Sequence, residues 1–326
     1  MKRLACLRVG IAAFGIASIG LALPARAVIV LGGRDATGAL NNSGQNINPA
    51  PGNLESYVGT WGSYLGTPIA PDYFITANHI GDGGSGGTFL YSDGGATPLT
   101  YTATLAGTQD DLAIWKISNS DPAFTHYAPL YTGSSEVGLS MIDIGRGTPR
   151  GTVVNTPSTS TPAGWNWGSP NPRLVTWGAN TVSSVMTVTP TMPGFGGEFL
   201  KWAFTNNGNP DTGILSDGDS GGPAFVFNPV DNQYELDGIN SLVDEVSTQS
   251  DPKGNFTLAA ALYNTDGFYN GTTQITDANP FVLNSYSTLI SSRLDFIDSV
   301  TGVPEPGTFG FVSIIGIIGL YRRRAR

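Results

Sequence analysis

The 326-residue sequence has almost no cysteine and almost no histidine. Its single cysteine, Cys6, lies close to the amino terminus, and its two histidines are His79 and His126. Without a second cysteine the chain forms no internal disulfide, and two histidines without cysteine partners make a zinc site hard to assemble. A thiolate nucleophile is also excluded beyond Cys6. The sequence therefore implies neither a metal nor an organic cofactor.

Charge is scarce, and positive charge in the body of the chain is scarcer still. Charged residues make up 13% of the sequence, and the formal net charge is −9. Four of the cations lie in residues 1–27 and four in the last five residues, so residues 28–303 hold 8 Lys and Arg against 24 Asp and Glu. A body with this excess of acid repels phosphate groups. Nucleic acid is therefore excluded as a partner.

Long apolar runs are confined to the two ends, and the first of them has the form of a secretory signal. Cations in MKRLACLR precede the apolar run VGIAAFGIASIGLALP, and the small residues ARA follow. This order predicts a signal peptide over residues 1–27, cut by signal peptidase after Ala27. An amino-terminal membrane anchor is the alternative, and the cleavage site directly after the apolar run disfavours it.

The second apolar run lies in the segment 301–326 and is followed by arginines. Residues 307–321 are apolar but number only 15, whereas a helix needs about 20 to span a bilayer. The order of Pro-Glu-Pro, apolar stretch and arginine cluster resembles the PEP-CTERM sorting signal. The resemblance implies a Gram-negative bacterium, a transient inner-membrane anchor, and cleavage near 304–306 by an exosortase. Under this interpretation, or as an ordinary carboxyl-terminal anchor, the body lies in the periplasm, at the cell surface or in the extracellular matrix.

Between the ends, the composition is typical of many short strands joined by turns. The chain contains 44 glycines and 22 prolines, which gather between short runs of β-branched and aromatic residues. This pattern predicts an all-β sandwich or pair of barrels. One helix is expected, within residues 285–300, where apolar residues recur at near-helical spacing. Residues 155–173 are rich in Pro, Ser and Thr and predict a long surface loop, with Trp165 and Trp167 packed against the body rather than stacking on carbohydrate.

A glycine-rich turn, SDGDSGGPAF (216–225), surrounds Ser220 and leads into an apolar strand. It is either a plain hairpin turn or the seat of a nucleophile, and a nucleophilic serine needs a base and a group that orients the base. His79 ends an apolar strand in IAPDYFITANHI, and Asp111 directly precedes the alternating strand LAIWKI. The chain thus supplies candidates for both partners.

The blocks TANH, DLAIWKI and GDSGGP, in this order, resemble the three catalytic blocks of the chymotrypsin/trypsin-like serine peptidases. The resemblance runs from about residue 57 to residue 297. It implies two packed six-stranded antiparallel Greek-key β-barrels with a short carboxyl-terminal helix. Residues 28–133 would form the first barrel, with His79 and Asp111, and residues 134–300 the second, with Ser220.

The resemblance also implies a role for each residue of the site. Ser220 would attack the scissile carbonyl, His79 would take the serine proton, and Asp111 would orient the imidazole. The backbone N–H groups of Gly218 and Ser220 would form the oxyanion hole. Asp110 is expected to be a solvated neighbour of Asp111, and His126 a surface or packing residue.

Specificity and activation are less well determined by the motifs. Matching to the family implies that Ile214, Ser241 and Val243 line the specificity pocket, with Ser241 also supporting Asp111. Ile214 at the pocket floor favours an uncharged, apolar or small substrate side chain, whereas the acidic Asp217 near the rim favours a basic one. Asp219 is expected to pair with the amine of Val28, or of Val30 after trimming. The alternative is that VIVL is simply a first strand.

These observations predict an exported serine endopeptidase that hydrolyses peptide bonds in proteins or peptides through an acyl-enzyme. Two alternatives remain open. The chain is a surface-anchored binding or matrix protein on an inactive peptidase fold, or it is a self-processing protease with one dedicated target.

Overall fold

The computed structural model describes residues 28–95, 97–169, 174–192, 195–247 and 257–302. The expected signal peptide, with Cys6, lies outside the described residues, as does the expected sorting segment 301–326 from residue 303 onward. Within those ranges, no helix combines the length and the apolar character needed to cross a bilayer. The described chain is mostly β-structure, as the sequence predicts, with an 11-residue helical stretch at its carboxyl-terminal end made of the 3-10 turn η3 (Ser291–Arg293) and helix α1 (Leu294–Thr301).

The first half of the chain forms a closed, six-stranded antiparallel barrel in the order β2-β3-β4-β7-β6-β5. Aromatic side chains fill its interior, where Phe74 stacks on Phe89 at a centroid distance of 4.0 Å. Their burial in alternating strand positions explains why the barrel closes without a disulfide. Its strands are β2 (Gly59–Trp61), β3 (Tyr64–Ala70), β4 (Tyr73–Ala77), β5 (Thr88–Tyr91), β6 (Leu99–Gln109) and β7 (Leu112–Ile117).

The second half forms an open, seven-stranded sheet in the order β11-β8-β15-β16-β22-β13-β12. The sequence predicted a second closed barrel here, and the described strands do not close one. The two edge strands, β11 and β12, follow each other along the chain with only Val182 and Ser183 between them. They do not pair with each other: β11 pairs with β8, and β12 pairs with β13. The strands are β8 (Ser140–Gly145), β11 (Thr176–Thr181), β12 (Ser184–Met192), β13 (Phe195–Ala203), β15 (Pro223–Asn228), β16 (Gln233–Val243) and β22 (Asn284–Leu289).

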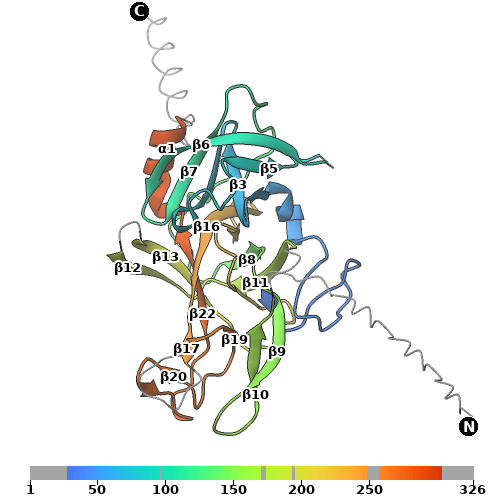
Figure 1. Cartoon of the computed structure of the whole chain (residues 1–326), viewed down its shortest axis with the longest axis vertical. Coiled ribbons are helices and arrows are strands. Elements are labelled where there is room, and N and C mark those ends of the chain that lie inside the picture. The colour runs from blue at the N-terminus through green and yellow to red at the C-terminus, as the bar shows by residue number, and fades with distance from the viewer. Residues whose placement is uncertain (1–27, 96, 170–173, 193–194, 248–256, 303–326) are drawn as a thin grey trace, which may run out of the picture.

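Three smaller sheets complete the second half, and two of them lie at the end of the molecule away from the barrel (Figure 1). One consists of β9 (Arg150–Asn155), β10 (Pro162–Trp167) and β19 (Ala260–Leu262). The loop predicted for residues 155–173 is therefore wrong in its middle, since β10 pairs on both sides. The others are β1 (Ile29–Val30) with β14 (Gly213–Ile214), and β17 (Val246–Ser247), β18 (Thr257–Leu258), β20 (Tyr269–Asn270) and β21 (Thr273–Gln274).

The helix predicted over residues 285–300 begins later than expected. The first part of that segment is strand β22, because Ser285 and Ser287 are buried and their backbone pairs with β13 and β16. Helix α1 lies beside β6 of the first barrel, where Phe296 and Val300 surround Gly107. The chain thus returns from the second half to cover the first.

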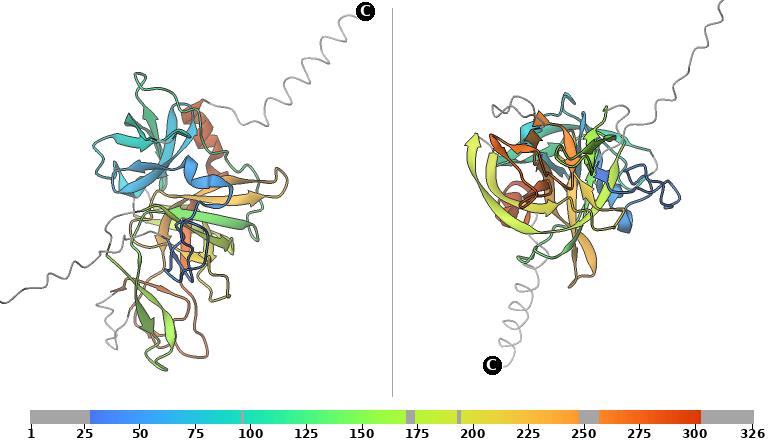
Figure 2. Two further views of the ribbon diagram at one scale, coloured as in Figure 1. Left: turned by 90° about the vertical axis from the view of Figure 1, so that its right-hand side faces the viewer. Right: turned by 90° about the horizontal axis from the view of Figure 1, so that it is seen from below.

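A shared apolar core joins the two halves. It contains Leu65 and Ile75 from the barrel together with Ile144 and Phe225 from the seven-stranded sheet. Figure 2 shows the barrel and the seven-stranded sheet stacked one above the other. This packing brings the end of β4 close to the turn that precedes β15, since Gly221 in that turn contacts Thr76. The candidate site lies at this junction. The remaining 3-10 elements are η1 (Pro51–Tyr57) and η2 (Asn78–Ile80).

Candidate active site

His79 and Asp111 come together because their strands are neighbours in the barrel. Strand β4 ends at Ala77 opposite Leu112, so η2, which carries His79, lies beside Asp111. The backbone N–H of His79 donates to Oδ1 of Asp111 at 2.9 Å, and His79 Nδ1 lies 2.9 Å from Oδ2. The Asp111 side chain is fully buried, whereas the imidazole is 32% exposed. A carboxylate facing Nδ1 requires the proton on that nitrogen, which leaves Nε2 as the acceptor.

Ser220 lies in the turn between β14 and β15, and its hydroxyl faces the free side of the imidazole. Oγ is 2.9 Å from Nε2 of His79. The turn fits against the barrel only because residue 221 is glycine: φ is +79° there, and a Cβ would meet Thr76 Oγ1 and lie 2.5 Å from the Leu65 carbonyl oxygen. The structure therefore brings Ser220, His79 and Asp111, predicted from three separate motifs, into one hydrogen-bonded chain.

Asp111 has a further partner from the opposite half of the molecule. Ser241, on β16, donates its hydroxyl to Oδ2 of Asp111. Together with the donors from His79, this hydrogen bond gives the buried carboxylate several partners, which compensates its loss of water. Ser241 lies where the sequence placed it.

The residues expected to form an oxyanion hole, Gly218 and Ser220, lie in the turn between β14 and β15. Gly218 adopts φ +92°, a conformation that non-glycine residues rarely adopt. Among the described residues, no atom accepts a hydrogen bond from the backbone N–H of Gly218 or of Ser220. Two free N–H groups beside a nucleophile are suited to binding an oxyanion.

Asp219 points away from the nucleophile, into the protein. It is 1% exposed and accepts hydrogen bonds from the N–H groups of Gly147 at 2.6 Å and Ser216 at 2.7 Å. The backbone N–H of Val28 also donates to it, but burial outweighs these donors and raises the pKa of Asp219 to about 6. The N–H of Val30 bonds instead to the carbonyl oxygen of Gly44, so the residue that reaches Asp219 is Val28.

Strand β1 follows Val28 directly and pairs with β14. Ile29 is opposite Ile214, and Val30 is opposite Gly213. The two interpretations of VIVL are therefore compatible, because the segment forms a strand and also presents Val28 to Asp219.

A cavity of about 450 Å³ lies beside Ser220. Of the three residues expected to line a specificity pocket, Ser241 and Val243 line this cavity and Ile214 does not. Ile214, which was expected at the pocket floor, lies away from this cavity: its side chain is fully buried in an apolar cluster and its backbone pairs with β1. Two exposed acidic residues, Asp217 and Glu245, line the cavity together with the apolar Trp167 and Ala259.

Three of these lining residues, Trp167, Ala259 and Glu245, were not assigned to the site by the sequence analysis. Trp167 ends strand β10, and its backbone N–H donates to the carbonyl oxygen of Ala259 at 2.8 Å, which fixes its backbone at the cavity. The alternation of Trp165 and Trp167 was the signal for a strand, but the surrounding Pro, Ser and Thr concealed it. No motif or spacing in the sequence indicated that Glu245 lines this cavity.

The neighbouring residues singled out by sequence have structural partners. Asp110 is not merely solvated, because it forms an ion pair of 2.9 Å with the buried Arg293. His126 packs as expected: it stacks on Tyr57 at 4.3 Å, and Nε2 lies 2.9 Å from the Ser56 hydroxyl. Across the described ranges, no three His, Cys, Asp or Glu side chains gather where they could bind a metal ion.

Comparisons with known proteins add little to this geometry. No protein-family model matches the chain, and no curated protein matches it. Among solved structures, the chain is similar to the passenger domain of plasmid encoded toxin, an autotransporter enterotoxin from enteroaggregative Escherichia coli. The TM-score is 0.43 at 13% identity, and the match covers 74% of this chain and 22% of that chain. This chain thus matches about a fifth of that structure's length, and any functional argument depends on the site itself.

Proposed function

We propose that this chain is an exported serine endopeptidase of the chymotrypsin/trypsin-like type. The observation that carries the proposal is the continuous line of contacts from Ser220 Oγ through both imidazole nitrogens of His79 to the buried Asp111. A serine with a base at 2.9 Å, and a base oriented by a buried carboxylate, is the arrangement that activates a hydroxyl for acyl transfer.

The chemistry follows from these contacts. As Ser220 Oγ attacks a scissile carbonyl, its proton passes to Nε2 of His79, and Asp111 stabilises the imidazolium. The oxyanion accepts hydrogen bonds from the N–H groups of Gly218 and Ser220, each worth about 3 kcal/mol in the transition state. The imidazolium then gives its proton to the leaving amine, and a water activated by the same imidazole hydrolyses the acyl-enzyme.

The rest of the architecture fits this proposal. The open seven-stranded sheet takes the place of the second barrel, with its edge strands β11 and β12 joined through Val182 and Ser183. Signal peptidase would free the amine of Val28, which then pairs with Asp219 and fixes the turn that carries Gly218. The PEP-CTERM-like tail would hold the protein at the inner membrane until an exosortase removes it. No cofactor takes part.

The substrate is a protein or peptide outside the cytoplasm, and the cavity beside Ser220 receives the side chain before the scissile bond. Because Ile214 does not reach this cavity, the argument for an apolar or small side chain loses its basis. The exposed carboxyl groups of Asp217 and Glu245 favour a cationic side chain, lysine or arginine, at this position.

A fluorophosphonate probe tests the proposal on the secreted protein, with Ser220→Ala as the control. We expect covalent labelling of the wild type and none of the variant. A folded, correctly processed wild type that fails to react would contradict the proposal and favour a binding protein on an inactive peptidase fold. Labelling without cleavage of a mixed peptide library would indicate a protease with one dedicated target.

A further inference from the structure

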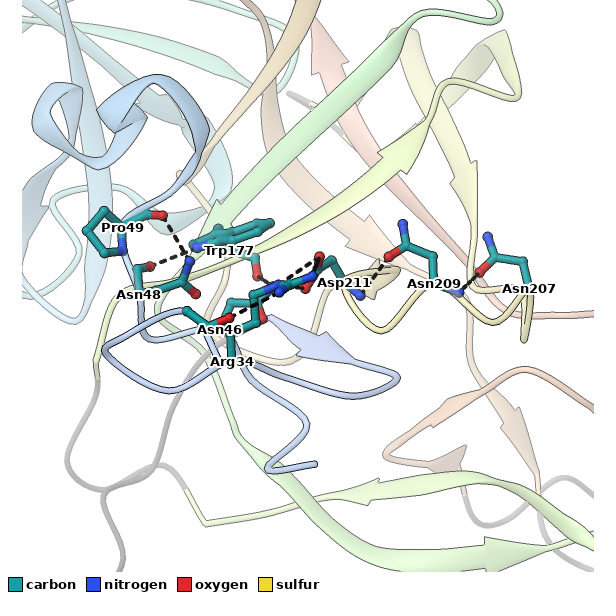
Figure 3. A network of polar contacts seen from close by, with 9 residues as sticks. Arg34, Asn46, Asn48, Pro49, Trp177, Asn207, Asn209 and Asp211 are labelled. Atoms are coloured by element: carbon teal, nitrogen blue, oxygen red, sulfur yellow. Dashed lines mark hydrogen bonds and ion pairs between the residues drawn. The ribbon is translucent and has the colours of Figure 1, made fainter. Parts of the chain in front are cut away.

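The amino-terminal segment is fastened to the body at several points beyond Val28. Arg34 makes a two-pronged ion pair with Asp211, with Nη2 at 2.8 Å from Oδ2. Asn46 donates to the carbonyl oxygen of Trp177 at 3.2 Å, and Trp177 Nε1 donates to the carbonyl oxygen of Asn48 at 2.9 Å. Figure 3 shows this network running from the amino-terminal segment to the loop before β14. These contacts, with the β1–β14 pairing, fix where the Val28 nitrogen lies.

A second buried carboxyl group, Asp143 of β8, lies beside Val28. The alpha-carbons of Gly178 and Gly213 approach closely at this point, and a Cβ on Gly178 would lie 2.9 Å from Val28 Cγ1 and 3.0 Å from Asp143 Oδ1. The Val28 side chain and the Asp143 carboxyl group therefore line the same small space. Only glycine at positions 178 and 213 leaves room for both.

Asp143 has no partner for its charge. Its side chain is fully buried, and neither carboxyl oxygen has a hydrogen-bond partner among the described residues. Burial, and secondarily the nearby charge of Asp219, raises the pKa of Asp143 to about 7. The strands packed around it, β11, β14 and β15, carry no ionisable side chain, so the charged side chain that acts on it is Asp219, and Val28 is its neighbour through the side chain.

We propose that Asp143 is a second carboxylate ligand of the Val28 ammonium group and holds the processed amino terminus together with Asp219. This inference rests on the proposed function for the cut after Ala27. Two carboxylates in one closed space repel each other until a cation arrives, and the freed ammonium is the cation that the geometry supplies. Asp143 is thus a positioning residue, acting on the nucleophile turn through Val28 and Asp219.

The pKa of the Val28 ammonium group distinguishes this role of Asp143 from simple packing. An ammonium held by two carboxylates gives up its proton at higher pH than one held by a single carboxylate. The processed protein is treated with an acylating reagent over a pH series from neutral to strongly alkaline. Tryptic cleavage after Arg34 releases the peptide 28–34, which contains no lysine, so its mass reports acylation of the α-amine alone.

We expect Asp143→Asn, and Asp143→Thr as a second neutral variant suited to a strand, to lower the pH midpoint of acylation by at least about one unit. Asp237→Asn is the matched control, because Asp237 is fully buried but packs against Ser291 and Glu136 rather than against Val28. It should leave the midpoint unchanged. Asparagine at 143 should be tolerated, since it has the shape of the neutral carboxyl group.

Folded neutral variants with the wild-type midpoint would overturn the proposal. So would a processed terminus other than Val28, or a wild-type midpoint no higher than the usual α-amine pKa of about 8. The acylation readout uses no substrate and can be made on the Ser220→Ala background. It therefore separates the two ideas: absence of probe labelling removes the proposed function alone, and an unshifted amine removes the role of Asp143 alone.

Discussion

Arg293, which leads into helix α1, forms an ion pair of 2.9 Å with Asp110, the residue directly before the buried Asp111. The guanidinium is 2% exposed and also donates to the carbonyl oxygens of Glu198 and Leu289. The carboxyl-terminal helical stretch is in this way tied to the loop that holds the orienting carboxylate. The loop of the first barrel that carries Asp111 and the end of the chain form one unit.

Removing the carboxylate from this pair should be costly. We expect Asp110→Ala to lower the free energy of unfolding by about 3 kcal/mol, because it removes the hydrogen-bonded carboxylate partner of a buried guanidinium. Chemical denaturation measures this. Asp295→Ala, which removes an exposed acid from the same helix, should change stability by less than about 0.5 kcal/mol. Equal effects of the two substitutions would show that the ion pair contributes nothing.

The hydroxyl of Ser241 should matter for rate more than for stability. Ser241→Ala removes one donor from the Asp111 carboxylate, and the negative charge that orients His79 is then less well compensated. We expect probe labelling to slow about tenfold, corresponding to roughly 1.4 kcal/mol, while the thermal midpoint changes little. Unchanged labelling would mean that the donors from His79 suffice.

The acid residues of the cavity predict a preference for basic side chains. In the double variant Asp217→Asn with Glu245→Gln, we expect the ratio of kcat/KM for lysine and arginine substrates to that for leucine substrates to fall by about tenfold or more. Asp295→Asn, an exposed acid away from the cavity, is the control and should leave the ratio unchanged. A wild-type preference for leucine would contradict the prediction before any variant is made.

A comparison of two glycines distinguishes the cost of backbone conformation from the cost of packing in the turn that carries Ser220. Gly221 and Gly208 have nearly the same φ, +79° and +81°, but only Gly221 has neighbours within 4 Å. Gly208→Ala should cost about 1 kcal/mol through its backbone alone. Gly221→Ala should cost clearly more and should also abolish probe labelling, since the new methyl group pushes the turn away from Thr76. Equal costs would mean that the turn yields without strain.

The unprocessed protein should be less stable at neutral pH than in mild acid. Its buried carboxyl groups bind protons more tightly folded than unfolded, with pKa values of about 7 for Asp143 and about 6 for Asp219 against the usual 3.8. Their stabilising contribution to the free energy of unfolding is fully present below about pH 4 and is lost as the pH rises to about 7. A form that retains Ala27 before Val28 allows thermal melting across this range.

The matched comparisons isolate the groups concerned. Asp143→Asn should flatten this pH dependence. Processing to Val28 should flatten it too, because the ammonium favours the ionised carboxylates. Asp237 contributes in the same direction, since burial and the charge of Glu136 raise its pKa, but it is unchanged in all three proteins. A melting temperature that rises from mild acid to neutral pH in the unprocessed form would contradict the assignment.

The triad was within reach of sequence analysis because each member lies in a short motif with fixed local structure. His79 ends a strand, Asp111 begins one, and the glycines around Ser220 permit only a tight turn. Adjacent strands then bring the first two together without any long-range detail. A closed first barrel was implied by the family resemblance that these motifs carry, and the pattern of short strands and turns by itself left a sandwich open.

The rest depends on contacts between distant segments, which local patterns do not contain. Ile214 was assigned by counting from Ser220, but pairing of β14 with β1 turns it into the core. Residues 285–289 have a spacing compatible with a helix, and neighbours on both sides make them a strand. Strand β10 lies in a composition typical of loops, and only its partners β9 and β19 order it.

Because the amino-terminal segment is already attached to the body, processing would require no large rearrangement of the chain. Strand β1 and the ion pair of Arg34 with Asp211 form in the full chain, before any cut. Cleavage after Ala27 then converts an amide N–H that is already in place into an ammonium group, with two more protons and a positive charge, without a segment having to search for its site. We therefore expect activity to follow the cut without a lag, at a rate limited by the processing enzyme and not by refolding of the nucleophile turn.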